Sequence, residues 1–162
     1  MSTSTWTTKL GGSEFKIMRL ADAGLFDTCT LDVPIYAVNY IRPKLEQSII
    51  YRPDVENLIV IHLNVRCKPI GFEIISLGTL DTLLVHPREV FRSAIIANSA
   101  RIILVHNHPS GEPTPSEADI KITRDLIKAG QLIKIDVADH LILGDPRRSP
   151  NYYSLKELGY FC

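Results

Sequence analysis

The chain has 162 residues, of which 45% are hydrophobic, so it is long enough to bury a core without disulfides or a structural metal. Lys plus Arg and Asp plus Glu number 18 each, so no net charge attracts the chain to nucleic acid or to anionic membranes. These values weigh against a dedicated nucleic-acid binder, although a local basic patch stays open.

The cysteines and the N-terminal segment indicate the compartment and the domain organisation. Cys29, Cys67 and Cys162 are odd in number and lack CxxC spacing, which indicates neither a disulfide framework nor a cysteine zinc site. Residues 1–14 are rich in Ser, Thr and Gly and predict a flexible tail, which leaves 15–162 as a single domain. No signal peptide and no apolar run near the ~18 residues of a membrane span occur, so we expect a cytoplasmic protein that does not bind membranes.

The first half of the chain predicts a helix followed by a hairpin. A helix is expected over 32–45, where Pro43 must end or bend it. Two apolar runs follow at 57–65 and 69–77, and their short separation predicts neighbouring antiparallel strands.

The second half alternates helices with strands. Apolar spacing predicts a helix over 87–98, and the continuous apolar run 101–105 is typical of a strand covered on both faces. A further helix is expected with Thr114 at N-cap, Pro115 at N1 and Glu117 at N3, ending before Gly130. Short strands are predicted at 133–137, 140–144 and 151–155. This alternation indicates an α/β layered sheet.

The segment His-Asn-His-Pro-Ser-Gly directly follows the predicted buried strand. Residues two apart on a strand point to the same side, so His106 and His108 can converge on one point. Ligand sites in sheets of this class lie at the carboxyl ends of strands, which is where these histidines stand.

Asp119 follows Ser116 at helical spacing, so the two side chains share one helix face. Two imidazoles and one carboxylate suit Zn²⁺, and three protein ligands leave a fourth position for water, whose pKa the metal lowers to roughly 7. The alternatives are that each histidine is structural and that Asp119 only stabilises the helix N-terminus.

The spacing His-x-His-x(7)-Ser-x(2)-Asp, carried by His106, His108, Ser116 and Asp119, matches the JAMM motif. With the surrounding sequences GTLDTLLVHPREVF, ILVHNHPSGEPTPSEADI and DHLILGD, the chain resembles the RadC-like branch of the JAB/MPN metalloprotease family. The resemblance implies a cytidine-deaminase-like fold, a three-layer mixed sheet with helices on both faces. It also implies zinc held by the two histidines and the aspartate, and hydrolysis of a peptide or isopeptide bond.

The family mechanism further needs a glutamate on an upstream strand to accept a proton from the attacking water. Glu73 is the candidate, because a carboxylate on a strand apolar on both faces is costly to bury unless it has a partner. The alternatives are a solvated Glu73 at a fraying strand end, or Glu112 as the base. Ser116 is expected to hydrogen-bond the attacking water or the oxyanion, or else only to favour the helix start.

Three functions are compatible with these patterns. The first is a zinc-dependent peptidase or isopeptidase acting on an unidentified peptide or protein. The second is a DNA-repair or mobile-element accessory protein that uses zinc structurally. The balanced charge argues against this function, because it predicts only weak nucleic-acid binding. The third is a protein-binding module without turnover. Deamination is disfavoured, because the PCxxC zinc motif of deaminases is absent from the sequence.

Overall fold

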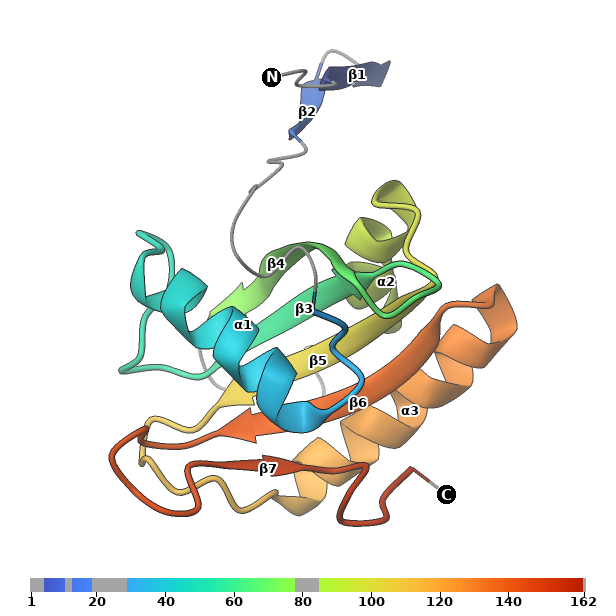
Figure 1. Cartoon of the computed structure of the whole chain (residues 1–162). Coiled ribbons are helices and arrows are strands. Elements are labelled where there is room, and N and C mark those ends of the chain that lie inside the picture. The colour runs from blue at the N-terminus through green and yellow to red at the C-terminus, as the bar shows by residue number, and fades with distance from the viewer. Residues whose placement is uncertain (1–4, 11–12, 19–28, 78–84, 162) are drawn as a thin grey trace.

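A five-stranded mixed sheet forms the centre of the protein (Figure 1), for which the computed structural model describes residues 5–10, 13–18, 29–77 and 85–161. Only β5 and β6 run parallel, and the other neighbouring strands are antiparallel. The strand order is β4 (Pro69–Leu77), β3 (Asn57–Leu63), β5 (Arg101–Asn107), β6 (Asp136–Leu143) and β7 (Tyr152–Ser154).

Helices cover both faces of this sheet and make it the middle of three layers (Figure 1). On one face α1 (Pro34–Glu46) packs on alternate residues of β3, β5 and β6. On the other face α2 (Pro87–Ile96) and α3 (Glu117–Ile133) pack on the intervening residues. Because β3 and β5 are apolar on both faces, they are the buried central strands. The predicted three-layer α/β fold is confirmed.

An antiparallel hairpin of β1 (Thr5–Leu10) and β2 (Ser13–Met18) forms a separate two-stranded sheet near the N-terminus. It overlaps the segment 1–14, for which the sequence predicts a flexible tail. The mobility of that segment stays a prediction, as does the single domain over 15–162. No helix in the described residues is long and apolar enough to cross a membrane.

The start and the end of α3 differ from the sequence prediction. The N-cap is Ser116 rather than Thr114, and Asp119 completes the capping box at N3 in place of Glu117. Gly130 lies inside the helix, which continues to a left-handed Lys134. A Cβ on Gly130 would stand 2.4 Å from the carbonyl oxygen of Ile135, so this glycine permits a close approach of the chain rather than a helix end.

One further prediction needed correction, whereas the helix over 32–45, the β3–β4 hairpin and the short β7 are confirmed. The expected strands 133–137 and 140–144 form one strand, β6, because its pairing with β5 continues along its whole length. Helix α1 contains Pro43 and does not end there.

Candidate metal centre

The carboxyl end of β5 brings the two histidines of the HNHP segment together. His106 points from β5 toward the α3 side of the sheet with 1% of its surface exposed, and His108 follows directly after the strand. Their ring centroids lie 4.7 Å apart in an edge-to-face arrangement. The period of two along the strand therefore places both imidazoles on one side, as the sequence predicts.

The first turn of α3 supplies a buried carboxylate to the same place. Asp119 is 2% exposed, with Oδ1 at 3.0 Å from His106 Nδ1 and Oδ2 at 3.5 Å from His108 Nε2. Ser116 holds this carboxylate, because its main-chain N–H and its hydroxyl both donate to Asp119 Oδ2 at 2.8 and 2.6 Å. The capping box that begins the helix therefore also orients the carboxylate.

His106 stands out among the buried polar groups. Although Nδ1 lies near Asp119, neither of its ring nitrogens makes a hydrogen bond of acceptable geometry with the described part of the chain. Buried polar atoms are nearly always satisfied in folded proteins, so an imidazole with two unsatisfied nitrogens calls for another partner. A metal ion bound to one nitrogen is such a partner.

His108 has its ring orientation set by the loop that follows it. Its Nδ1 lies 2.7 Å from the carbonyl oxygen of Glu112. A carbonyl only accepts, so Nδ1 carries the proton and Nε2 keeps its lone pair on the side of Asp119. An imidazole whose second nitrogen donates to a carbonyl is the usual arrangement for a metal ligand.

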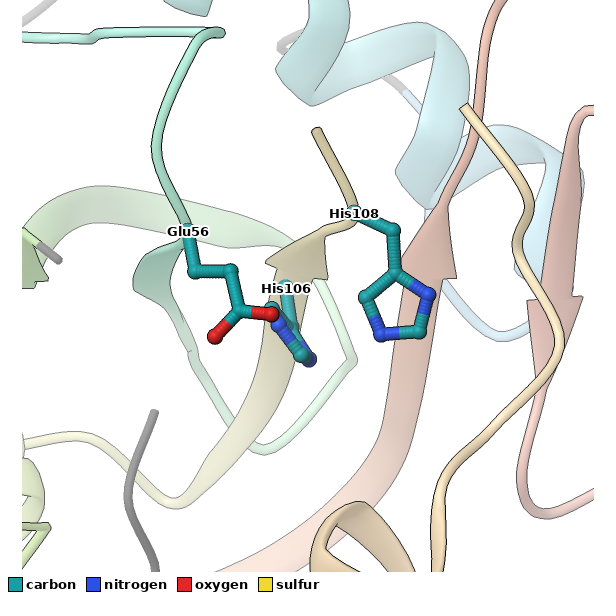
Figure 2. Close-up of side chains that lie close together, drawn as sticks. All are labelled: Glu56, His106 and His108. Carbon is teal, nitrogen blue, oxygen red and sulfur yellow. The ribbon is translucent and has the colours of Figure 1, made fainter. Parts of the chain in front are cut away.

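The third residue beside the histidines is Glu56, which sequence reasoning missed. Ligand atoms of Glu56, His106 and His108 all lie within 4.8 Å of one another, and the three side chains converge on one space in Figure 2. Glu56 stands immediately before β3, and the β3–β5 pairing of Leu58 with His106 carries it to the end of β5. Asp119 is not a member of this group, although its carboxylate lies 3.0 and 3.5 Å from the two imidazoles. Imidazoles and carboxylates are donors that fit a divalent metal.

Glu73 and Glu112, the two glutamates proposed from sequence, lie in other surroundings. Glu73 is on β4 opposite Val60, and its carboxylate pairs at 3.6 Å with Arg92 of α2, with 38% of the side chain exposed. Glu112 contacts His108 only through its main-chain carbonyl, and its carboxylate accepts a hydrogen bond from Thr114 at 2.7 Å. The group of described residues suited to a metal contains Glu56 and neither of these two.

The charge of Asp119 is the electrostatic centre of the site. Burial alone would raise the pKa of this carboxyl, but its contacts with His106, His108 and Ser116 outweigh burial and lower the pKa well below its usual range. The same contact with Asp119 raises the pKa of His108. An ionised carboxylate between two imidazoles attracts a cation, so the electrostatics agree with the donor set.

Behind His106 lies a further imidazole, that of His140 on β6, with ring centroids 6.3 Å apart. Complete burial lowers the pKa of His140 to about 3, so the ring is neutral. Thr123 of α3 contacts its Nδ1 at 2.6 Å and donates to the carbonyl of Asp119 at 2.5 Å. His140 is thus a core histidine, and through Thr123 it links β6 to the turn that carries Asp119.

Comparison with known proteins agrees with this geometry. Residues 32–160 match the model of a family described as a RadC-like JAB domain. A UPF0758 protein of Caldanaerobacter subterraneus is 52% identical over 106 residues, which is 65% of this chain and 44% of that protein. UPF0758 proteins of Methanosarcina acetivorans and Methanosarcina mazei are 41% and 46% identical over 126 residues, which is 78% of this chain and 50% of theirs. The chain therefore spans about half the length of these relatives.

Proposed function

This chain belongs to the RadC-like JAB domain family, and we propose that it is a zinc-dependent hydrolase that cleaves an amide or isopeptide bond. The observation that carries the proposal is His106, a buried imidazole without a hydrogen-bond partner of acceptable geometry among the described residues. It lies in one group with His108 and Glu56, and 3.0 Å from the Asp119 carboxylate. A structural role for this histidine would leave Nε2 buried without a hydrogen bond, at a free-energy cost of about 1–3 kcal/mol. A metal ligand avoids that cost.

We assign the metal to His106, His108 and Asp119, the three residues that the JAMM spacing marks. Nitrogen and oxygen donors without thiolate suit Zn²⁺, and three protein ligands are the number typical of catalytic rather than structural zinc. Two of these ligands are oriented by hydrogen bonds: the Glu112 carbonyl orients His108, and the Ser116 hydroxyl orients Asp119. Such supporting hydrogen bonds are typical of functional metal sites.

Glu56 is the general base in this proposal, in place of Glu73. When bound, zinc supplies Lewis-acid chemistry that acidifies a water molecule and polarises the substrate carbonyl. The Glu56 carboxylate then takes the proton from the attacking water and passes it to the nitrogen that leaves as the amine. Glu73 is paired with Arg92, whereas Glu56 lies beside the two histidines, as this transfer requires.

Ser116 has a supporting role in this proposal. Its hydroxyl donates to Asp119 at 2.6 Å and accepts from the Asp119 main-chain N–H at 3.2 Å. The hydroxyl is therefore engaged with the ligand it orients. Donation to an oxyanion, the role expected from sequence, would require this hydrogen bond to open.

The test compares Glu56→Gln with Glu73→Gln as the matched control, using elemental analysis and cleavage of a peptide library. Glutamine keeps the shape of the side chain but cannot accept the proton. We expect about one zinc per chain in both variants, a ~10²–10⁴-fold slower hydrolysis in Glu56→Gln, and the wild-type rate in Glu73→Gln.

Two results would contradict the proposal. A wild-type protein that binds no zinc would remove the metallohydrolase assignment altogether. Loss of hydrolysis in Glu73→Gln, with Glu56→Gln at the wild-type rate on a verified substrate, would return the general base to Glu73.

A further inference from the structure

Two buried amides, Asn57 and Asn107, join the ends of β3 and β5 beside the proposed metal site. They are 0% and 4% exposed. The pairing of Leu58 with His106 places them side by side at the next position along the strands. Asn107 itself stands between His106 and His108, with its side chain on the opposite face of the strand.

The main chain determines which way the Asn107 amide points. Its Oδ1 accepts from the main-chain N–H of Asn57 at 2.9 Å, and its Nδ2 donates to the carbonyl of Val55 at 3.0 Å. A main-chain N–H only donates and a carbonyl only accepts, so the amide cannot be reversed without losing both bonds. Asn57 Nδ2 adds hydrogen bonds to Asn107 Oδ1 at 2.8 Å and to the Val55 carbonyl at 2.7 Å.

These hydrogen bonds hold both peptide units that flank Glu56. The Val55 carbonyl belongs to the peptide unit before Glu56, and the Asn57 N–H belongs to the unit after it. One side chain thus restrains the backbone on both sides of Glu56, although Glu56 precedes the regular pairing of β3. Because Asn107 stands between the two histidines, the carboxylate is positioned relative to the same residues that bind the metal.

We propose that Asn107, supported by Asn57, is a positioning residue that holds the Glu56 carboxylate against the metal-binding histidines. This inference rests on the proposed function and adds the part of the molecule that sets its geometry. Leucine at 107 would match the amide in size, but it would leave the Asn57 N–H without its buried partner and the Val55 carbonyl with the Asn57 amide as its remaining donor. Aspartate at 107 would place a carboxylate oxygen, which cannot donate, where the Asn107 amide now donates to the Val55 carbonyl.

The test is a double-mutant cycle on zinc affinity, measured by competition with a chelating dye for wild type, Glu56→Gln, Asn107→Leu and the double variant. A carboxylate just outside the ligand shell affects metal affinity by about tenfold or more. We expect about tenfold weaker zinc binding in each single variant and no further loss in the double variant, because Asn107 acts through Glu56.

Three results of the cycle would overturn the inference. Wild-type affinity in Asn107→Leu would show that the amide does not matter to the site. A loss in Asn107→Leu without one in Glu56→Gln would show that it acts on another group. A double variant about 100-fold weaker than wild type would show independent effects, as expected if Asn107 acts directly on the histidines.

Asn57→Ala is a milder variant, because position 57 keeps its main-chain N–H to Asn107. The variant loses the side-chain donor Nδ2 and the Oδ1 that accepts from the Arg52 N–H at 3.4 Å. Its zinc affinity should fall between those of wild type and Asn107→Leu, and wild-type affinity would count against the inference. The matched control is Asn64→Ala in the turn after β3, where Asn64 Oδ1 accepts from the main chain of Arg66 and Lys68 at 2.8 and 3.1 Å. It should leave zinc affinity within about twofold of wild type, because that turn is at the other end of β3.

Amide hydrogen exchange separates failure of this inference from failure of the proposed function. In Asn107→Leu the Asn57 amide should exchange at least about tenfold faster, while amides in the middle of β5 stay protected. A wild-type protein that binds no zinc contradicts the proposed function, whereas unchanged exchange at Asn57 contradicts the positioning by Asn107.

Discussion

Asp119 on α3 and Asp139 on β6 are both buried carboxylates, 2% and 5% exposed, yet their surroundings differ in kind. Asp139 accepts from the Ser154 hydroxyl at 2.8 Å and from the main-chain N–H of His140 at 2.7 Å and of Lys156 at 3.3 Å. In Asp119, Ser116 holds Oδ2, which also lies 3.5 Å from His108 Nε2, and Oδ1 lies 3.0 Å from His106 Nδ1.

Burial by itself therefore does not mark a functional carboxylate. Burial raises the pKa of Asp139, and its hydrogen-bond donors together with the charge of Lys156 only partly offset that effect. At Asp119 the histidines and Ser116 reverse the effect of burial and lower the pKa. The distinguishing feature is that His106, the neighbour of Asp119, lacks hydrogen bonds of its own to the described residues, whereas the partners of Asp139 complete a structural anchor for β7.

The largest difference between the two carboxylates should appear in zinc affinity. We expect Asp119→Asn to weaken zinc binding by more than about 100-fold, beyond the range for groups outside the ligand shell, because a neutral amide oxygen replaces an anionic ligand. Asp139→Asn should bind zinc as wild type does in the same dye-competition titration. Equal losses in the two variants would break the distinction drawn here.

A smaller effect is expected from removing the hydroxyl that serves each carboxylate. Ser154→Ala should lower the free energy of unfolding by about 1–3 kcal/mol, because Asp139 is left buried without one of its donors, and should leave zinc affinity unchanged. Ser116→Ala should lower it by about 1 kcal/mol through the lost helix cap and should also weaken zinc binding. Urea denaturation and zinc titration measure the two effects; a zinc defect in Ser154→Ala would be inconsistent with a purely structural Asp139.

An effect on pH dependence is also expected, measured as urea stability of the zinc-free protein and of its Asp139→Asn variant from pH 4 to 7. Asp139 has a folded pKa above its unfolded value of about 4, so its contribution is fully present below that value and is lost as pH rises through the folded pKa. Wild type should therefore lose stability relative to Asp139→Asn over this range, by about 1.4 kcal/mol for each pH unit between the two pKa values.

Asp119 contributes a pH dependence of stability with the opposite sign in the same zinc-free protein. Its folded pKa is lowered, so its contribution to stability is present above the unfolded pKa and is lost as pH falls.

The outcome for Asp139 can also contradict the prediction. Parallel curves of stability against pH for wild type and Asp139→Asn would mean that burial does not perturb the Asp139 carboxyl.

Local periodicity was enough to predict much of the site and of the fold. The alternation of a strand put His106 and His108 on one side, and helical spacing put Ser116 and Asp119 on one face. The apolar run of β5 predicted a strand covered on both faces, which the two core clusters confirm. The cap of α3 was misplaced by two residues because Thr114 and Ser116 both fit the capping pattern, and only the contact with Asp119 distinguishes them.

The sequence by itself thus placed His106 and His108 on one side of a strand and Ser116 and Asp119 on one helix face, because each pair depends on spacing within one element. Only the tertiary structure brings Glu56 beside the two histidines. Glu56 reaches the histidines through the pairing of β3 with β5. The hydrogen-bonded Asn57 and Asn107 at the ends of these strands are 50 residues apart in the chain, and no local pattern specifies that register. Glu73 looked suitable on its own strand, but Arg92 comes from a helix packed over it, and that partner exists only in the folded protein.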